Sequence, residues 1–253
     1  IPGSEPQTKT ITTLDRNLGA LNGEIPDTPE SALQSYGLYY QWGRKDPSMP
    51  PPTHNYRPLS TATSPYWDYF GDEFHSTSVI NFGSPTIMDG VRHPMYIILP
   101  TEIAEFYQYD WLGEKNDVLW GDPSSLIIGK TIYDPCPFGY RGPQQELSSY
   151  LVSKEGNISS HSYGITVPGA NSETLFFPAA GYKGVDRGIS SLTAAWKYVG
   201  EKGDYHSSHI HSNGHRLRTY ISRVKSKWPE TGADTDDDGI GDGSNTYNAQ
   251  YIT

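Results

Sequence analysis

Glycine and proline interrupt this sequence throughout, and they constrain its fold more than any other feature. The 253 residues include 26 Gly and 20 Pro, distributed along the whole length. Proline breaks helix interiors and glycine weakens them, so we expect short strands, short helices, turns and loops. This length suits one elaborated domain with a substantial core, and we predict a single domain over residues 1–253.

The expected core is aromatic. Apolar residues make up 35% of the chain, a low share for a globular protein, yet there are 19 Tyr, 6 Trp and 7 Phe. Such large, stiff side chains bury much area at low rotamer cost.

The charge balance narrows the choice of partners. The chain has 29 Asp and Glu against 19 Lys and Arg, a net charge of -10. This charge opposes nucleic acid and anionic membranes as partners, and it favours cations and neutral ligands. The longest apolar run, Met95 to Leu99, has the length of a strand, so no membrane span is predicted in this segment.

Two observations bear on the compartment. The chain begins at Ile1 without a leader pattern, so we expect a signal sequence, with or without an upstream domain, to precede it. Cys136 is the one cysteine and cannot form an internal disulfide, which suits a cysteine-poor exported bacterial protein.

Local patterns predict few regular elements. Short helices are expected from Thr101 to Phe106 and from Pro143 to Val152, and a further helical turn is expected between Ser31 and Tyr40. Strands are expected at Thr8–Leu14, Tyr96–Leu99, Leu175–Phe177 and Trp196–Val199.

The Asn213-Gly214 dipeptide is typical of a type I′ turn and predicts a hairpin. A two-residue loop there would place His211 opposite Arg216 and Ile210 opposite Leu217. Ile210 and Leu217 would then share one face, and a polar face would hold His209, His211, Arg216 and Arg218.

Three motifs occur in order, followed by a weaker fourth. They are Leu14-Asp15-Arg16-Asn17-Leu18-Gly19-Ala20, Tyr36-Gly37-Leu38-Tyr39-Tyr40-Gln41-Trp42-Gly43-Arg44-Lys45-Asp46, Tyr133-Asp134-Pro135-Cys136-Pro137-Phe138-Gly139-Tyr140-Arg141 and Phe177-Pro178-Ala179-Ala180-Gly181-Tyr182. With them the chain resembles the Fibrobacter succinogenes major paralogous domain family, over about residues 11 to 220. It departs from the family pattern at Gly142-Pro143-Gln144, and the usual closing Arg-Cys strand is not evident before Thr253, so the terminus is either trimmed or divergent.

The resemblance implies an α+β, C-type-lectin-like fold: loop-rich, with small mixed or antiparallel sheets and two short helices. It also implies an extracellular location on a bacterial outer surface, as in surface and fimbrial-tip proteins of Bacteroidetes.

The residue types in these motifs favour structural roles. Asp15, Arg16 and Asn17 are expected to belong to the scaffold, since buried polar groups of this kind need each other as partners. Tyr39, Tyr40 and Trp42 are expected to pack in the core. For Gly43 to Asp46 we expect a solvated charge cluster.

An acidic loop at residues 231–247 carries the sharpest chemical signal. Oxygen ligands at alternating positions and a turn glycine are typical of calcium loops. The predicted ligands are Asp234, Asp236, Asp238, the carbonyl of Ile240 and Asp242, with Gly239 at the turn. The loop resembles those of thrombospondin type 3 repeats and dockerins. Since Asn245 replaces the usual bidentate Glu, we expect weak calcium binding; a solvated acidic loop is the alternative.

Catalytic functions agree less well with the sequence. A lone Cys136 cannot supply the cysteine pair of the formylglycine-generating relatives, and we predict no catalytic residues. Among His206, His209, His211 and His215, a polar surface hairpin is favoured over zinc. Glu102, Glu105, Asp110 and Glu114 leave a carbohydrate-active enzyme as a distant alternative.

We therefore expect an adhesion or ligand-binding module whose ligand is a glycan or a host surface protein. Aromatic faces stack on sugars, which suggests as contacts Tyr66, Trp67, Tyr69, Trp111 and Trp120. The alternative is a structural role in pilus assembly, with other pilus subunits as partners.

Overall fold

The computed structural model describes part of the chain. The described residues are 11–48, 79–100, 111–114, 116, 118–121, 129–143, 150, 157, 159–170, 172–187, 192–200, 202–210 and 216–222. Several predictions fall outside them: the helix from Thr101, most of the helix from Pro143, the ligand contacts Tyr66, Trp67 and Tyr69, and the whole acidic loop at 231–247.

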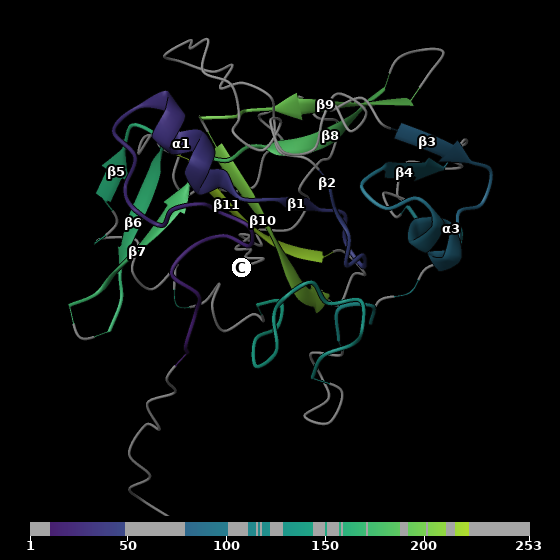
Figure 1. The fold of residues 1–253 in the computed structure, drawn as a ribbon, viewed down its shortest axis with the longest axis horizontal. Helices are drawn as coiled ribbons and strands as arrows, with labels where there is room; N and C mark the ends of the chain where they lie inside the picture. The colour runs from purple at the N-terminus through teal and green to yellow at the C-terminus, as the bar shows by residue number, and fades with distance from the viewer. Residues whose placement is uncertain are drawn as a thin grey trace, which may run out of the picture.

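The described residues form short elements of both kinds (Figure 1). The helices are α1 (Pro29–Tyr36) and α3 (Ile87–Arg92). The strands are β1 (Tyr39–Tyr40), β2 (Pro47–Ser48), β3 (Val79–Phe82), β4 (Ile97–Pro100), β5 (Ser159–His161), β6 (Gly164–Pro168), β7 (Thr174–Pro178), β8 (Tyr182–Arg187), β9 (Leu192–Lys197), β10 (Lys202–Ile210) and β11 (Arg216–Ser222).

The strands form small sheets, most of them antiparallel. The pairs β1–β2, β8–β9 and β10–β11 are antiparallel, β5–β6–β7 is a three-stranded antiparallel sheet, and β3–β4 is a parallel pair. In Figure 1 the sheet β5–β6–β7 lies on one side, β3, β4 and α3 lie on the other, and β10–β11 runs between them. The expected α+β content with small sheets is thus present in the described part of the chain.

Helix α1 forms where a further helical turn was expected. Thr28 caps its N-terminus, because its Oγ1 accepts from the Ser31 amide while the Ser31 hydroxyl accepts from the Thr28 amide. The helix ends before Gly37, whose φ of 75° is a conformation that favours glycine. Tyr39 and Tyr40 therefore continue as strand β1 and not as helix.

The hairpin prediction is confirmed, but its register is wrong. Strands β10 and β11 pair antiparallel, with Ile210 opposite Arg216 and His206 opposite Arg218. From His206 to Ile210 the chain advances four residues along β10, while the paired residues on β11 are only two apart. A prediction from the two-residue turn could not include this irregularity. The predicted sharing of a face by Ile210 and Leu217, and the polar face opposite, do not follow from this pairing.

The other strand predictions had mixed outcomes. Tyr96–Leu99 and Leu175–Phe177 correspond to β4 and β7, whereas only the first two residues of Trp196–Val199 belong to a strand, β9. Residues 11–14 of the strand expected at Thr8–Leu14 are not in a strand. Helix α3 was missed, although its signal was present: Thr86 and Asp89 form a reciprocal capping box.

The described core includes two apolar clusters, and β1 contacts both. The first cluster contains Ala32, Leu33, Tyr36, Tyr163, Ala180 and Val199. The second contains Trp42, Ile98, Trp111, Leu112, Leu119 and Trp120. Tyr39 packs against the first cluster and Tyr40 against the second, so consecutive residues of one short strand link the two. Five of these twelve residues are tyrosine or tryptophan, in line with the aromatic core expected from the composition.

Candidate functional site

The first two sequence motifs pack against each other. Asn17 is buried and donates from Nδ2 to the carbonyl of Tyr36, 3.0 Å away, and the Leu38 amide donates to the carbonyl of Leu18. Asn17 thus has the scaffold role expected of it. Asp15 and Arg16 differ, because both are exposed and their ion pair joins one to the other at 2.6 Å.

The second motif also reaches the fourth. The Tyr39 hydroxyl donates to the carbonyl of Ala180, and the Tyr205 hydroxyl on β10 donates to the carbonyl of Pro178. Trp42 is buried in the second cluster. The core roles expected of Tyr39, Tyr40 and Trp42 therefore agree with their positions.

Arg44 corrects the expectation of a solvated charge cluster. Its residue is 4% exposed, and its guanidinium donates to Gln41 Oε1 at 3.0 Å and to three carbonyls, those of Tyr96, Gly90 and His93. Burial lowers the Arg44 pKa, although the charge of Asp46 opposes this shift. The prediction of a solvated Arg44 was wrong because the planar guanidinium has several N–H donors, and backbone carbonyls can accept from them in place of water.

Two of the five expected ligand contacts are described, and both lie in the core. Trp111 is 4% exposed and donates from its indole to the Trp42 carbonyl, and Trp120 is 1% exposed and donates to the Arg44 carbonyl. Neither ring presents a face for a ligand at the surface.

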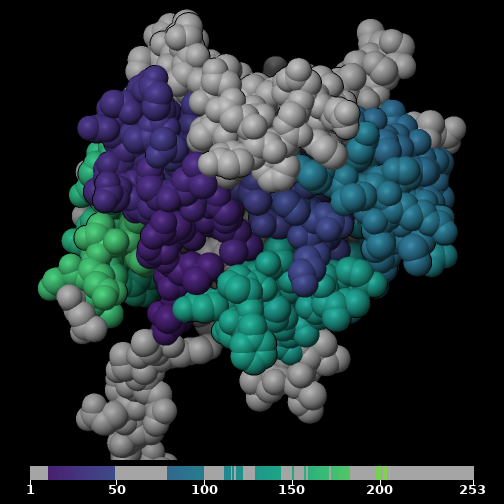
Figure 2. Space-filling view, viewed as in Figure 1, coloured from purple at the N-terminus to yellow at the C-terminus, as the bar shows by residue number. Residues whose placement is uncertain are grey.

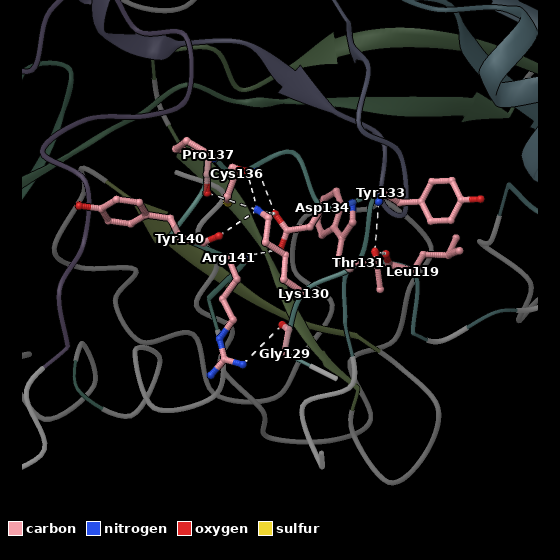
Figure 3. Close-up of polar contacts among 12 residues, drawn as sticks. Leu119, Gly129, Lys130, Thr131, Tyr133, Asp134, Cys136, Pro137, Tyr140 and Arg141 are labelled. Atoms are coloured by element: carbon pink, nitrogen blue, oxygen red, sulfur yellow. Dashed lines mark hydrogen bonds and ion pairs between the residues drawn. The ribbon is translucent and has the colours of Figure 1, made fainter. Parts of the chain in front are cut away.

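Asp134 of the third motif and Lys130, which precedes the motif, form a hydrogen-bonded node (Figure 3). The Asp134 side chain is 0% exposed; its Oδ1 accepts from the Cys136 amide at 2.8 Å and its Oδ2 from the Gly142 amide at 3.0 Å. The Lys130 ammonium lies 3.1 Å from Asp134 Oδ1 and neutralises this buried charge. A buried carboxylate needs such a partner, since its desolvation is costly.

The ammonium of Lys130 also orders the backbone around it. It donates to the carbonyls of Cys136 and Tyr140 as well as to Asp134, which uses its three protons. The Pro137 carbonyl lies farther away, at 3.5 Å, and accepts from the Tyr140 amide at 3.0 Å. One lysine therefore fixes the chain from Cys136 to Tyr140.

Three tight turns meet near this node, at residues 118–121, 131–134 and 137–140; we call them the turn cluster (teal in Figure 2). The Thr131 hydroxyl donates to the Leu119 carbonyl and so ties the first turn to the second. Lys130, which is paired with Asp134 of the second turn, donates to the Tyr140 carbonyl of the third. The third turn is of type II, with Gly139 at φ 86°.

Each turn of the cluster exposes one apolar side chain. Val118 is 44% exposed, Ile132 77% and Phe138 102%, the highest value among the large apolar residues described. Next to Ile132, by contrast, Tyr133 packs against the second apolar cluster and anchors its turn to the core. The cluster therefore presents apolar side chains on a backbone that hydrogen bonds hold in place.

Cys136 lies inside the node with its side chain buried. Burial raises the pKa of its thiol far above the usual value, and the nearby Asp134 charge and hydrogen bond raise it further. At neutral pH the thiol is protonated, a poor nucleophile.

Within the described residues, no group of three or more His, Cys, Asp or Glu side chains is placed to hold a metal. The described helices also include none long and apolar enough to cross a membrane. Comparison with family models, curated proteins and solved structures gave no match for this chain.

Proposed function

We propose that this chain is a binding module of a bacterial outer surface, a C-type-lectin-like domain of a fimbrial-tip or surface protein. Support comes first from the four motifs, which occur in the family order. Hydrogen bonds join the first to the second and the second to the fourth. Tyr133 of the third packs against the apolar cluster that contains Trp42 of the second.

The observation that carries the proposal is the turn cluster. Apolar side chains exposed on a fixed backbone are costly in water but favour association, because little conformational entropy is lost on binding. The protonated thiol of Cys136 agrees with a binding role over thiol chemistry.

The experiment is a binding assay with the purified chain. It is applied to a glycan array and to cultured epithelial monolayers, in millimolar calcium and in EGTA. Saturable binding to either surface supports an adhesion module. Failure to bind either surface in both solutions would count against it.

The proposal includes calcium binding by the acidic loop at residues 231–247. The ligand pattern of Asp234, Asp236, Asp238, Ile240 and Asp242 suits a hard cation with weak affinity. Binding to the folded state raises the melting temperature, so added calcium is expected to shift it by a few degrees and the double variant Asp234→Ala, Asp236→Ala to cancel the shift. Magnesium is the matched control, and an equal shift with both ions would contradict a calcium site.

A structural role in pilus assembly is the second candidate function. The exposed apolar side chains of the turn cluster would suit contact with a pilus subunit as well as contact with a host protein. Co-expression with candidate pilus subunits would distinguish the two. A stable complex that forms through the turn cluster would support assembly.

A further inference from the structure

Asn22 and Gly23 follow the first motif and form a dipeptide whose side-chain amide can be lost spontaneously. The Gly23 backbone nitrogen attacks Cγ of Asn22: an N–Cγ bond forms, the Cγ–Nδ2 bond breaks, and ammonia leaves with the proton of the Gly23 amide. Water then opens the succinimide at either carbonyl and yields aspartate or isoaspartate. Glycine favours this reaction because it has no Cβ to hinder the approach of its nitrogen.

Helix α1 holds the reacting residue. Asn22 Nδ2 donates to Gln34 Oε1 at 3.1 Å, and the Gln34 carbonyl accepts from the amides of Leu21 and Asn22 at 2.8 and 3.4 Å. This carbonyl is among the last four of α1, which have no partner within the helix. Gln34 therefore fixes both the main chain and the side chain of Asn22.

Two features of this contact oppose the reaction. Ammonia leaves only when Nδ2 is released, so the hydrogen bond from Nδ2 to Gln34 must break. The negative charge of the tetrahedral intermediate develops on Asn22 Oδ1, which is buried and has no hydrogen-bond donor to stabilise that charge. Asn22 therefore reacts faster from a locally opened state, in which water reaches its side chain.

The product cannot restore the contact. Aspartate and isoaspartate carry a carboxylate, which has no proton to donate to Gln34 Oε1. Its second oxygen would take the place of Asn22 Oδ1, where a buried charge without a donor is costly. Conversion of the amide therefore removes the hydrogen bond that delayed it.

We propose that Asn22 is a spontaneous modification site and that its hydrogen bond to Gln34 delays the modification. While the contact is closed, the amide persists. Each opening exposes it to attack by Gly23, and conversion to a carboxylate keeps the contact open. The modified fraction therefore increases with the age of the folded chain and weakens the attachment of residues 21–22 to α1.

The test follows Asn22 by peptide mapping with mass spectrometry while the whole chain is incubated at pH 8, folded or in concentrated guanidinium chloride. Gln34→Ala removes the acceptor, and Gln34→Glu keeps an acceptor oxygen. Glu30→Ala, at an exposed position of α1, is the matched control. Thermal melting checks that each variant is folded. Asn213-Gly214 is the same dipeptide in the same chain and serves as the reference in denaturant.

We expect Asn22 to deamidate roughly fivefold or more slowly in the folded chain than in denaturant, the factor that corresponds to the net strength of an ordinary hydrogen bond. Gln34→Ala should raise the rate in the folded chain by about the same factor. Gln34→Glu and Glu30→Ala should leave the rate close to that of the unaltered chain. In denaturant, Asn22 and Asn213 should react alike.

Equal rates for Asn22 in the folded and the denatured chain would overturn the inference, and this comparison needs no variant. A folded Gln34→Ala variant in which Asn22 reacts no faster than in the unaltered chain would also overturn it. Absence of deamidation at Asn22 in denaturant would show that the dipeptide is not reactive. None of these results bears on the proposed binding function.

Discussion

At the scale of single residues, Arg44 is a buried cation whose hydrogen-bond acceptors among the described residues are an amide oxygen and backbone carbonyls. Its guanidinium donates to Gln41 and to three backbone carbonyls, and it lies 5.7 Å from the Trp111 ring centroid. These carbonyls belong to α3 and to the segment between α3 and β4. The Arg44 side chain of the second motif therefore fixes the chain that leads into β4, one strand of the parallel pair.

Replacing Arg44 should therefore be costly. Arg44→Ala leaves the Gly90, His93 and Tyr96 carbonyls without their donor, and we expect a loss of about 3 kcal/mol or more in the free energy of unfolding. Arg44→Lys should also destabilise, because an ammonium cannot span the same acceptors. Urea denaturation measures both, with exposed Arg92→Ala expected to stay within about 0.5 kcal/mol. A stable Arg44→Ala would contradict this role.

Cys136 gives a prediction about reactivity. Since burial raises its pKa, the thiol stays protonated as the pH rises to 8, where a free cysteine is already partly thiolate. The folded chain should react very slowly with Ellman's reagent at pH 8 and should release about one equivalent of thiolate in concentrated guanidinium chloride. Rapid reaction of the folded chain would contradict this prediction, because it would show that the Cys136 thiol is accessible to the reagent.

At the scale of elements, prediction succeeded where the local chemistry was sufficient. Strands β4 and β7 and the existence of the β10–β11 hairpin follow from short apolar runs and a turn dipeptide. The hairpin register could not be predicted, because the strand pairing shifts between His206 and Ile210, away from the turn dipeptide on which the prediction was based.

The candidate site was not predicted from the sequence. The third motif was recognised for the family resemblance alone, and residue type directed attention to Trp111 and Trp120, which are buried. The exposure of Phe138 depends on the Lys130 node, whose partners come together through the fold of that loop.

Two glycines test how the first two motifs pack. Gly19 and Gly139 occupy the same position of type II turns, with φ of 75° and 86°. A Cβ at Gly19 would lie 2.7 Å from the Leu38 side chain, whereas one at Gly139 would meet nothing within 4 Å. Gly139→Ala should cost about 1 kcal/mol from the backbone conformation alone, and Gly19→Ala about 1–3 kcal/mol more from overpacking. Equal losses in urea denaturation would show that Leu38 moves aside freely.

At the scale of the whole molecule, the linkage between the two apolar clusters decides whether the chain unfolds as one unit. Tyr39 and Tyr40 bridge the clusters, and Trp42, two residues further on, belongs to the second. The single-domain prediction therefore has a measurable consequence, since small single domains unfold cooperatively.

Leu33→Ala perturbs one cluster, and half of the tryptophans that contribute to the fluorescence lie in the other. Leu33 is 0% exposed in the first cluster, and three of the 6 Trp residues, Trp42, Trp111 and Trp120, lie in the second. Truncating a buried leucine costs about 2–5 kcal/mol, and in one cooperative unit that loss moves every probe together. We expect the fluorescence and circular dichroism midpoints in urea to fall equally. If the fluorescence midpoint stays fixed while the dichroism midpoint falls, the clusters unfold separately and the chain contains two folding units.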